Sequence, residues 1–360
     1  MIQSSLVDLK DRLSDQYSGI FCPTDFNLDF EERGVSPQFR ELAETYHQKY
    51  TDYERYKGFI TRGLAHMGVH PPGEIQTVLD VGSGSGNTFF PLLEMFPQAT
   101  LIATDISPQL LRILQEIMTP AQRSRTTLLC LDLTETQFQE GICDLAVGGA
   151  ILHHMFDPAI VIRENFRALK KNGWLMYTEP FEVGNSLLKL AYSMILNLAG
   201  HRDTIGRWSN PLPAPAIADK PQLHPLFKFF QQTQKSEKKY EIPHATYVFL
   251  CNYVADLEFR RGRDKSHPNY KTMDDKWLFT RKYIEDVASD IGASELQIHA
   301  LDPVTDQFTN MTKIYFRLAL SGVENPLPDW GWEILKFFDD FFSADLQNDL
   351  YPEAMILLKK

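Results

Sequence analysis

Short apolar runs alternate with helical segments through the middle of the chain, over residues 74–180. The runs lie at 77–81, 99–104, 127–131, 143–147 and 173–178. Runs of this length are typical of strands that are buried on both faces of a sheet. Between the second and third runs, Ser107 and Pro108 supply the N-cap and the first-turn proline of a helix. Strands that alternate with helices predict a parallel sheet with helices on both sides.

The flanking regions are predicted to complete this sheet and to cover it. Residues 1–73 have helical spacing and end in a Pro-Pro-Gly breaker, which indicates a helical N-terminal cover. Residues 181–292 are expected to form a helical insertion that binds substrate, and residues 293–360 to return to the sheet. Within the last region we expect strands at 296–301 and 354–359, with a helix favoured over a strand at 312–320. The predicted fold class is α/β, with a doubly wound, mostly parallel, seven-stranded Rossmann-like sheet.

The sequence LDVGSGSGN at 79–87 follows the first predicted strand and precedes a helix. Glycines at such a turn let the chain reverse sharply and let a ligand approach the backbone. A dinucleotide-binding loop needs its third glycine where this chain has Asn87, and no lysine follows the glycines as a phosphate-binding P-loop requires. The spacing therefore excludes a P-loop and counts against an NAD-type loop, and we favour cofactor binding over a plain strand-to-helix turn.

Acidic residues follow the next two predicted strands. Asp105, at the end of the second strand, could accept both hydroxyls of a ribose, and Asp132, after the third, could accept from an adenine amino group. Asp80, buried near the glycine loop, could orient an amino group directly or through water. For Asp132 an ordinary turn residue is the alternative interpretation.

Together with the segment DLAVGGAILHHMFDP at 144–158, these motifs resemble the class I S-adenosylmethionine (SAM)-dependent methyltransferases over residues 77–181. The stretch LHHMFDP looks like a subgroup that methylates small molecules. The resemblance implies SAM as cofactor, with the glycines near its methionine part, Ile106 on the adenine, and Gly149 beneath the methyl group. The expected cofactor-binding residues are Asp80, Gly82, Ser83, Gly84, Gly86, Asn87, Asp105, Ile106, Asp132, Leu133 and Gly149.

Three titratable residues lie near the expected carboxyl ends of strands four and five. His153 and His154 follow strand four and Glu179 ends strand five, so each is a candidate general base for an oxygen or carbon acceptor. The alternative is structural: the histidines pack at a helix entry, and the glutamate caps the next helix. The pattern shows no metal-binding constellation.

Two further patterns have a structural and a functional interpretation. Tyrosines recur at helical spacing, as core contacts or as a lid over the cofactor: Tyr46, Tyr50, Tyr53 and Tyr56. The basic cluster at 260–265 is a solvated surface or a site for an anionic substrate.

Charge and composition narrow the partners. The net charge is −11 and no base-flipping motif is present, so we expect no nucleic acid partner. The large, aromatic-rich insertion indicates a sizeable, partly apolar small-molecule acceptor, such as a natural-product intermediate. The apolar stretch at 186–198 is short for a membrane span and could line a pocket, touch a membrane surface or form a homodimer interface.

The expected location is the cytoplasm. The N-terminal sequence MIQSSLVDLKDRLSDQ lacks the apolar core of a signal peptide, and the four cysteines have neither zinc-site nor C-x-x-C spacing. Two other functions stay open at this point: a SAM-binding cyclase or non-catalytic regulatory protein, and an NAD or nucleotide-sugar enzyme, against which Asn87 counts.

Overall fold

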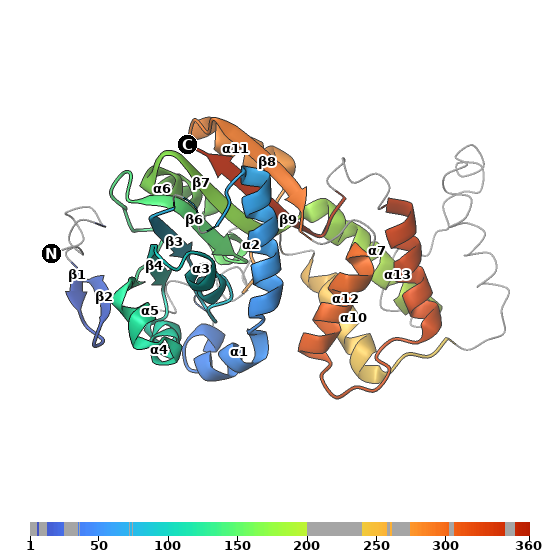
Figure 1. Cartoon of the computed structure of the whole chain (residues 1–360). Coiled ribbons are helices and arrows are strands. Elements are labelled where there is room, and N and C mark those ends of the chain that lie inside the picture. The colour runs from blue at the N-terminus through green and yellow to red at the C-terminus, as the bar shows by residue number, and fades with distance from the viewer. Residues whose placement is uncertain are drawn as a thin grey trace. The chain divides into compact units, whose positions relative to one another are not determined.

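The computed structural model describes residues 13–24, 37–71, 75–199, 240–257, 274–301, 306–342 and 350–360, together with the single residues 6, 35, 73 and 260. The chain divides into two compact units (Figure 1). The sheet unit contains residues 1–183, 259–302 and 351–360. The helical unit contains residues 184–258 and 303–350. The sequence also has a proline-rich break at 211–215, which lies outside the described residues.

A nine-stranded sheet forms the centre of the sheet unit, with the strand order β1-β2-β5-β4-β3-β6-β7-β9-β8. Its strands are β1 (Leu13–Asp15), β2 (Ile20–Pro23), β3 (Thr77–Val81), β4 (Thr100–Asp105), β5 (Thr126–Cys130), β6 (Cys143–Gly149), β7 (Leu169–Pro180), β8 (Glu295–Ala300) and β9 (Glu353–Lys359). The six strands from β2 to β7 in this order are parallel, whereas β1, β9 and β8 pair antiparallel with their neighbours.

The seven strands predicted from the sequence are all present, and the α/β class is confirmed. The prediction of seven strands was wrong because the N-terminal region adds the hairpin β1–β2. This hairpin pairs with β5 and buries Ile20 and Cys22 fully. Two alternating apolar residues are too weak a signal to distinguish a short edge strand from helical spacing.

Helices of the sheet unit connect and cover the strands. They are α1 (Ala43–Tyr50), α2 (Tyr53–Met67), α3 (Phe89–Met95), α4 (Pro108–Ile117), α5 (Pro120–Ser124), α6 (Pro158–Ala168) and α11 (Arg281–Asp290), with 3-10 turns η2 (Pro37–Phe39) and η3 (Leu152–His154). The helix predicted at Ser107–Pro108 is α4, where the Ser107 hydroxyl accepts from the amide of Leu110 at 3.2 Å. One apolar cluster joins α2, α3 and α4 to the sheet, and α6 packs on β6 and β7.

The helical unit contains most of α7 (Glu182–Leu198), together with α10 (His244–Asp256), α12 (Gln307–Ala319) and α13 (Asp329–Phe342). The helix favoured at 312–320 is part of α12. Buried polar pairs join these helices: Tyr192 Oη lies 2.9 Å from Thr312 Oγ1, and Tyr253 donates to Asn185 Oδ1 at 2.7 Å. Among the described residues, no helix combines the length and apolar character that crossing a membrane requires.

The order of the strands locates the ligand-binding edge. From β3 the chain proceeds through β4 and β5 on one side, and then returns to β6 and β7 on the other side. Ligands of open parallel sheets bind beyond the carboxyl ends of the strands, where the direction of winding reverses. The loops after β3 and β6 flank this point, so the glycine loop and the histidine motif belong to one edge.

Arg125, at the end of α5, connects this helix to the end of α3. Its guanidinium donates to three backbone carbonyls at the end of α3, those of Leu93, Phe96 and Ala99, at 2.6, 3.1 and 2.9 Å. These oxygens lie in the last turn of the helix and beyond it, where intrahelical donors are missing. One side chain thus fixes the junction between α3 and β4.

We expect Arg125→Ala to lower the free energy of unfolding by about 1–3 kcal/mol, the range for hydrogen bonds from a charged donor. Urea unfolding followed by circular dichroism measures the change. The control is Arg123→Ala, because the guanidinium of Arg123 donates to the carbonyl of Glu116 on the exposed surface. Equal effects of the two substitutions would contradict this assignment.

Candidate active site

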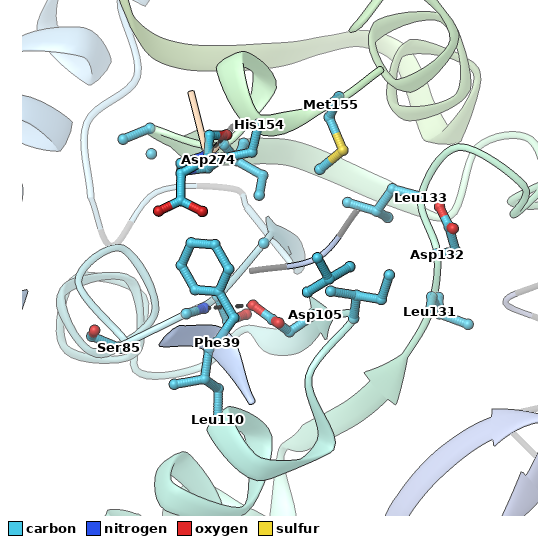
Figure 2. Close-up of a pocket in the computed structure, with 18 of the residues that line it drawn as sticks. Phe39, Ser85, Asp105, Leu110, Leu131, Asp132, Leu133, His154, Met155 and Asp274 are labelled. Atoms are coloured by element: carbon cyan, nitrogen blue, oxygen red, sulfur yellow. Dashed lines mark hydrogen bonds between the residues drawn. The ribbon is translucent and has the colours of Figure 1, made fainter. Parts of the chain in front are cut away.

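A pocket of about 290 Å³ opens at the carboxyl ends of β3 to β6 (Figure 2). Of the sequence-predicted residues, it is lined by Gly82, Ser83, Gly84, Asn87, Asp105, Ile106, Asp132, Leu133, Gly149 and His154. Asp80, Gly86, His153 and Glu179 lie outside this lining. The volume suits a small ligand rather than a macromolecular surface.

The glycine loop has the backbone conformation that its sequence requires. Gly82, Gly84 and Gly86 have φ values of 69, 48 and 84°, in the left-handed region that side chains disfavour. A Cβ atom at position 82 would lie 2.5 Å from the side chain of Ile151. The glycines therefore allow both the turn and the close packing of the loop after β6.

Asp105 connects this loop to the end of β4. Its carboxylate accepts from the amides of Gly84 and Ser107, each at 2.8 Å, and the residue is 7% exposed. Burial raises the pKa of Asp105 to about 6, although the backbone donors oppose the shift. Figure 2 shows the carboxyl group at the floor of the pocket, so near neutral pH an anionic acceptor of hydrogen bonds faces the ligand space.

Asp80 lies beneath the loop and is fully buried. Its Oδ1 accepts from the Thr88 hydroxyl at 2.5 Å, and burial raises its pKa to about 7. Among the described residues, Asp80 Oδ2 and the hydroxyls of Ser83 and Ser85 have no hydrogen-bond partner. Both serines line the pocket. Such buried polar groups are costly unless a ligand or water satisfies them.

The wall after β5 combines apolar and polar groups. Leu131, Asp132 and Leu133 lie along it in Figure 2, and Ile106 lines the same pocket. Asp132 Oδ1 accepts from both the amide and the hydroxyl of Thr134, at 2.9 and 2.6 Å. The turn and the binding interpretations of Asp132 are therefore compatible, because the turn orients the carboxylate beside the pocket.

Asn87 has a contact that the sequence analysis did not anticipate. Its amide oxygen accepts from the backbone of Asp52 at 2.7 Å, and its amide nitrogen donates to the Tyr50 carbonyl at 2.9 Å. These bonds fasten the junction of α1 and α2 to the glycine loop. An asparagine at this position thus holds the N-terminal cover over the pocket.

Aromatic residues of the N-terminal cover line the same pocket. Tyr46 and Tyr56, two of the four tyrosines considered as a lid, are part of the lining, as is Phe39 from η2. Figure 2 shows Phe39 reaching across the cavity between Asp105 and His154, and its ring lies 5.3 Å from that of His154 in an edge contact. Burial raises the pKa of Tyr56 to about 12, so its hydroxyl stays protonated.

The three candidate bases occupy different environments. Glu179 accepts from three successive amides, those of residues 151–153, and its Oε2 lies 2.7 Å from His153 Nδ1. His154 lines the pocket, and its Nδ1 lies 2.9 Å from the Asp274 carbonyl. Burial and the neighbouring His153 lower the pKa of His154 to about 3, so its imidazole is neutral.

The segment before α11 contributes residues that sequence analysis missed. Asp274 and Lys276 line the pocket, and Lys276 is only 2% exposed, with its Nζ 5.0 Å from the centre of the Phe156 ring. Burial lowers the pKa of Lys276. No local motif marks these residues, because only the fold brings them to the histidine loop. Within the basic cluster, Arg260 is described, and positions 261–265 lie outside the described residues.

A parallel sheet with a left-handed glycine loop, a buried acid at the end of the next strand and a covered pocket at the strand ends is typical of the Rossmann-like class. Residues 79–177 match the family model described as "Methyltransferase domain". The chain therefore carries a methyltransferase domain, and its resemblance to class I SAM-dependent methyltransferases is confirmed over this part.

Curated relatives agree with this assignment. The chain is 26% identical over 143 residues to a malonyl-[acyl-carrier protein] O-methyltransferase of Marinomonas sp. (strain MWYL1), covering 39% of this chain and 51% of that protein. It is 32% identical over 117 residues to the mitochondrial 2-methoxy-6-polyprenyl-1,4-benzoquinol methylase of Caenorhabditis elegans, covering 32% and 41%. The chain thus spans about half the length of the curated relatives it matches.

Among solved structures, phosphoethanolamine N-methyltransferase 2 of Haemonchus contortus in complex with S-adenosyl-L-methionine aligns with a TM-score of 0.47 at 14% identity. The alignment covers 94% of this chain and 61% of that chain.

The burial of Asp80 predicts a specific pH dependence of stability. Because the folded-state pKa, about 7, lies above the ordinary value of about 4, the folded protein holds this proton more tightly than the unfolded chain. Its contribution to the free energy of unfolding is therefore greatest at low pH and is lost as pH rises from about 4 through 7. Asp80→Asn should remove this pH dependence. As pH rises from 5 to 8, the free energy of unfolding of the variant should therefore rise relative to that of the native chain.

Urea unfolding of both proteins at pH 5, 6, 7 and 8 measures the difference. Asp105, whose pKa is also raised, is present in both chains, and its charge is the smallest of the influences on Asp80, so most of its effect cancels in the comparison. Parallel stability curves across this range would show that Asp80 does not carry the raised pKa.

Proposed function

We propose that this protein transfers the methyl group of SAM to an oxygen, nitrogen or carbon nucleophile of a small-molecule acceptor. The observation that carries the proposal is that the Asp105 carboxylate accepts hydrogen bonds both from the glycine loop and from the start of α4. It does so at the floor of a pocket within a methyltransferase domain. This arrangement presents a carboxylate to a ribose and an open backbone to the rest of the cofactor.

The residues present fit SAM by their chemistry. The Ser83 and Ser85 hydroxyls in the pocket lining offer partners for the amino and carboxylate groups of its methionine part, and Asp80 Oδ2, beneath the loop, would act on the amino group through water. A cationic amino group there would favour the ionised form of Asp80 and so offset the effect of burial. Asp105 would hold the ribose hydroxyls, with Ile106, Asp132 and Leu133 at the adenine and Gly149 near the methyl group.

When bound, SAM supplies a methyl group on a good leaving group, the sulfonium. The chain's own task is then to align the acceptor and to exclude water. Phe39, Tyr46 and Tyr56 lie over the pocket and are held there by Asn87 through the junction of α1 and α2. A covered, largely apolar entrance of this kind suits an acceptor with apolar surface.

His154 is the candidate base that reaches the pocket. Since Nδ1 faces the Asp274 carbonyl, which can only accept, Nδ1 carries the proton and Nε2 keeps its lone pair. A neutral imidazole with a low pKa is a weak base but a good hydrogen-bond acceptor. We infer that His154 orients a hydroxyl or amine of the acceptor, and that Asp274 and Lys276 supply the charges around it.

The proposal includes a cytoplasmic location and no nucleic acid partner, in accord with four free cysteines and a net charge of −11. It also includes a homodimer through α7, where Leu190 is 40% exposed. Size-exclusion chromatography with light scattering, on the native chain and on Leu190→Glu, tests the last point.

Asp105→Asn tests the cofactor site. We expect the affinity for S-adenosylhomocysteine to fall by about 1–3 kcal/mol, or roughly 5- to 150-fold, the range for hydrogen bonds to a charged group. Native affinity should weaken as pH falls through about 6, because protonation removes the carboxylate that accepts the ribose hydroxyls. The variant should show a flatter dependence.

Isothermal titration between pH 5 and 8 measures both effects, and thermal unfolding checks that the variant is folded. The control is Asp290→Asn, because Asp290 pairs with Arg163 on the exposed surface. Folded native protein that binds neither SAM nor S-adenosylhomocysteine would refute the proposed function.

Gly149→Ala tests the wall near the proposed methyl position. The added Cβ would lie 2.7 Å from a Tyr56 ring carbon and 2.8 Å from the Thr88 methyl group, so the cover must shift. We expect S-adenosylhomocysteine affinity to fall by about tenfold or more, in line with the cost of overpacking a closed site. Gly58→Ala is the matched control, since its Cβ would meet Arg62 at an ordinary 3.6 Å. Unchanged binding by Gly149→Ala would remove Gly149 from the site.

A further inference from the structure

A chain of charged groups, buried at Glu179 and His153 and half-buried at Asp275 and Arg260, lies beside the proposed acceptor side of the pocket. Glu179 on β7 contacts His153 on η3, and His153 in turn faces Asp275 with 3.4 Å between Nε2 and Oδ1. Arg260 closes the chain with a 2.7 Å contact to the other oxygen of Asp275. Two carboxylates thus alternate with an imidazole and a guanidinium.

Both ring nitrogens of His153 face carboxylate oxygens. A carboxylate only accepts, so an imidazole placed between two of them satisfies both contacts only as the doubly protonated cation. Burial alone would lower the pKa of His153, but Glu179 and Asp275 outweigh it and raise the pKa to about 10. Arg260 and His153 in turn hold the pKa of Asp275 well below its usual range, against the effect of burial. His153 therefore has no lone pair with which to accept a proton from an acceptor.

Further contacts bind the segment 274–279, which is remote in sequence, to the loop after β6. The carbonyl of His153 accepts from the amides of Lys276 and Trp277, at 2.7 and 3.2 Å. The Trp277 indole donates to the Met155 carbonyl at 3.0 Å, and Phe279 continues the attachment through a bridge to Phe181. His153 thus contacts the 274–279 segment with its backbone and with its side chain.

We propose that His153 is a positioning residue: held between Glu179 and Asp275, it fastens the segment 274–279 to the loop after β6 and thereby places Asp274 and Lys276 in the wall that selects the acceptor. This inference rests on the proposed function for the meaning of that wall, whereas the attachment itself is independent of it. Glu179 acts in the same way, through the three amides and the imidazole that it holds.

The residues facing His153 come from three elements, and each keeps one protonation state in this arrangement. Glu179 approaches from β7, Asp275 from the 274–279 segment, and the His154 ring from η3, with its centroid 4.0 Å away. The lowered pKa of His154 follows from burial and from the cationic neighbour. The attachment therefore also sets the neutral state of the imidazole that lines the pocket.

The test compares His153→Gln with the native chain by hydrogen exchange, read by mass spectrometry. Loss of the cation leaves Asp275 without its imidazolium, so we expect the amides of residues 276–279 to exchange at least tenfold faster. Exchange in β3 and β4 should stay unchanged, and S-adenosylhomocysteine affinity should change less than threefold. The control is His66→Gln, because His66 on α2 stacks on His299 away from the pocket.

Two further measurements distinguish positioning from general structural loss. Nitrogen-15 spectra of the native imidazoles should show His153 doubly protonated at pH 8. Asp275→Asn should release the same segment, and it also weakens the Arg260 contact. Adding His153→Gln to Asp275→Asn should change little further, because the contact between the two residues is already lost. Unchanged exchange at 276–279 in His153→Gln, or a neutral His153 at pH 8, would overturn the proposal. Failure of the native chain to bind S-adenosylhomocysteine would refute the proposed function and leave the exchange result intact.

Discussion

The active site depends first on the carboxylate of Asp105, which ties two loops to one strand end. Its two oxygens accept from Gly84 in the loop after β3 and from Ser107 at the start of α4. Both amides come from segments where the backbone has no partner within a helix or strand, so the carboxylate replaces secondary structure there. The parallel pairing of β3 with β4 brings these segments together, and only a glycine adopts the φ of 48° that aims the Gly84 amide inward at no steric cost.

Buried carboxylates serve the same purpose elsewhere at this edge. Asp80 holds Thr88 at the start of α3, and Glu179 holds three amides after β6. Burying a carboxylate is costly unless donors surround it, and each of these acids is provided with some. The partners of the two carboxylates differ. Glu179 faces the His153 cation, whereas one oxygen of Asp80 has no hydrogen-bond partner among the described groups. This contrast separates an acid whose structural role is complete from one whose bonding a ligand would complete.

The sequence predicts the parts of the fold that local pattern encodes. Buried parallel strands are continuous apolar runs, so β3 to β6 were predicted close to their observed limits, and the Ser107–Pro108 pair marked the start of α4. β7 begins at Leu169, ahead of the predicted start at 173, because the polar residues before Gly173 hide the beginning of the strand. The hairpin β1–β2 was missed because three or four residues at a sheet edge carry too little periodicity. The packing of 184–258 with 303–350 could not be predicted either, since it depends on long-range contacts between helices whose individual patterns fit many partners.

The same distinction separates the two sides of the pocket. The proposed cofactor side comes from residues 82–133 and 149, which follow consecutive strands, so their positions in the sheet are implied by their positions in the sequence. The proposed acceptor side combines Phe39, His154, Asp274 and Lys276 from three segments far apart in sequence. These segments are held by side-chain bonds such as that of Gln38 to Asp274, at 2.9 Å, and by a few backbone bonds after β6 and β7, rather than by the pairing of neighbouring long strands. Substitutions in the proposed acceptor wall therefore need not disturb the hydrogen bonds that Asp105 accepts from Gly84 and Ser107. A scaffold of this kind can change its acceptor while it keeps its cofactor.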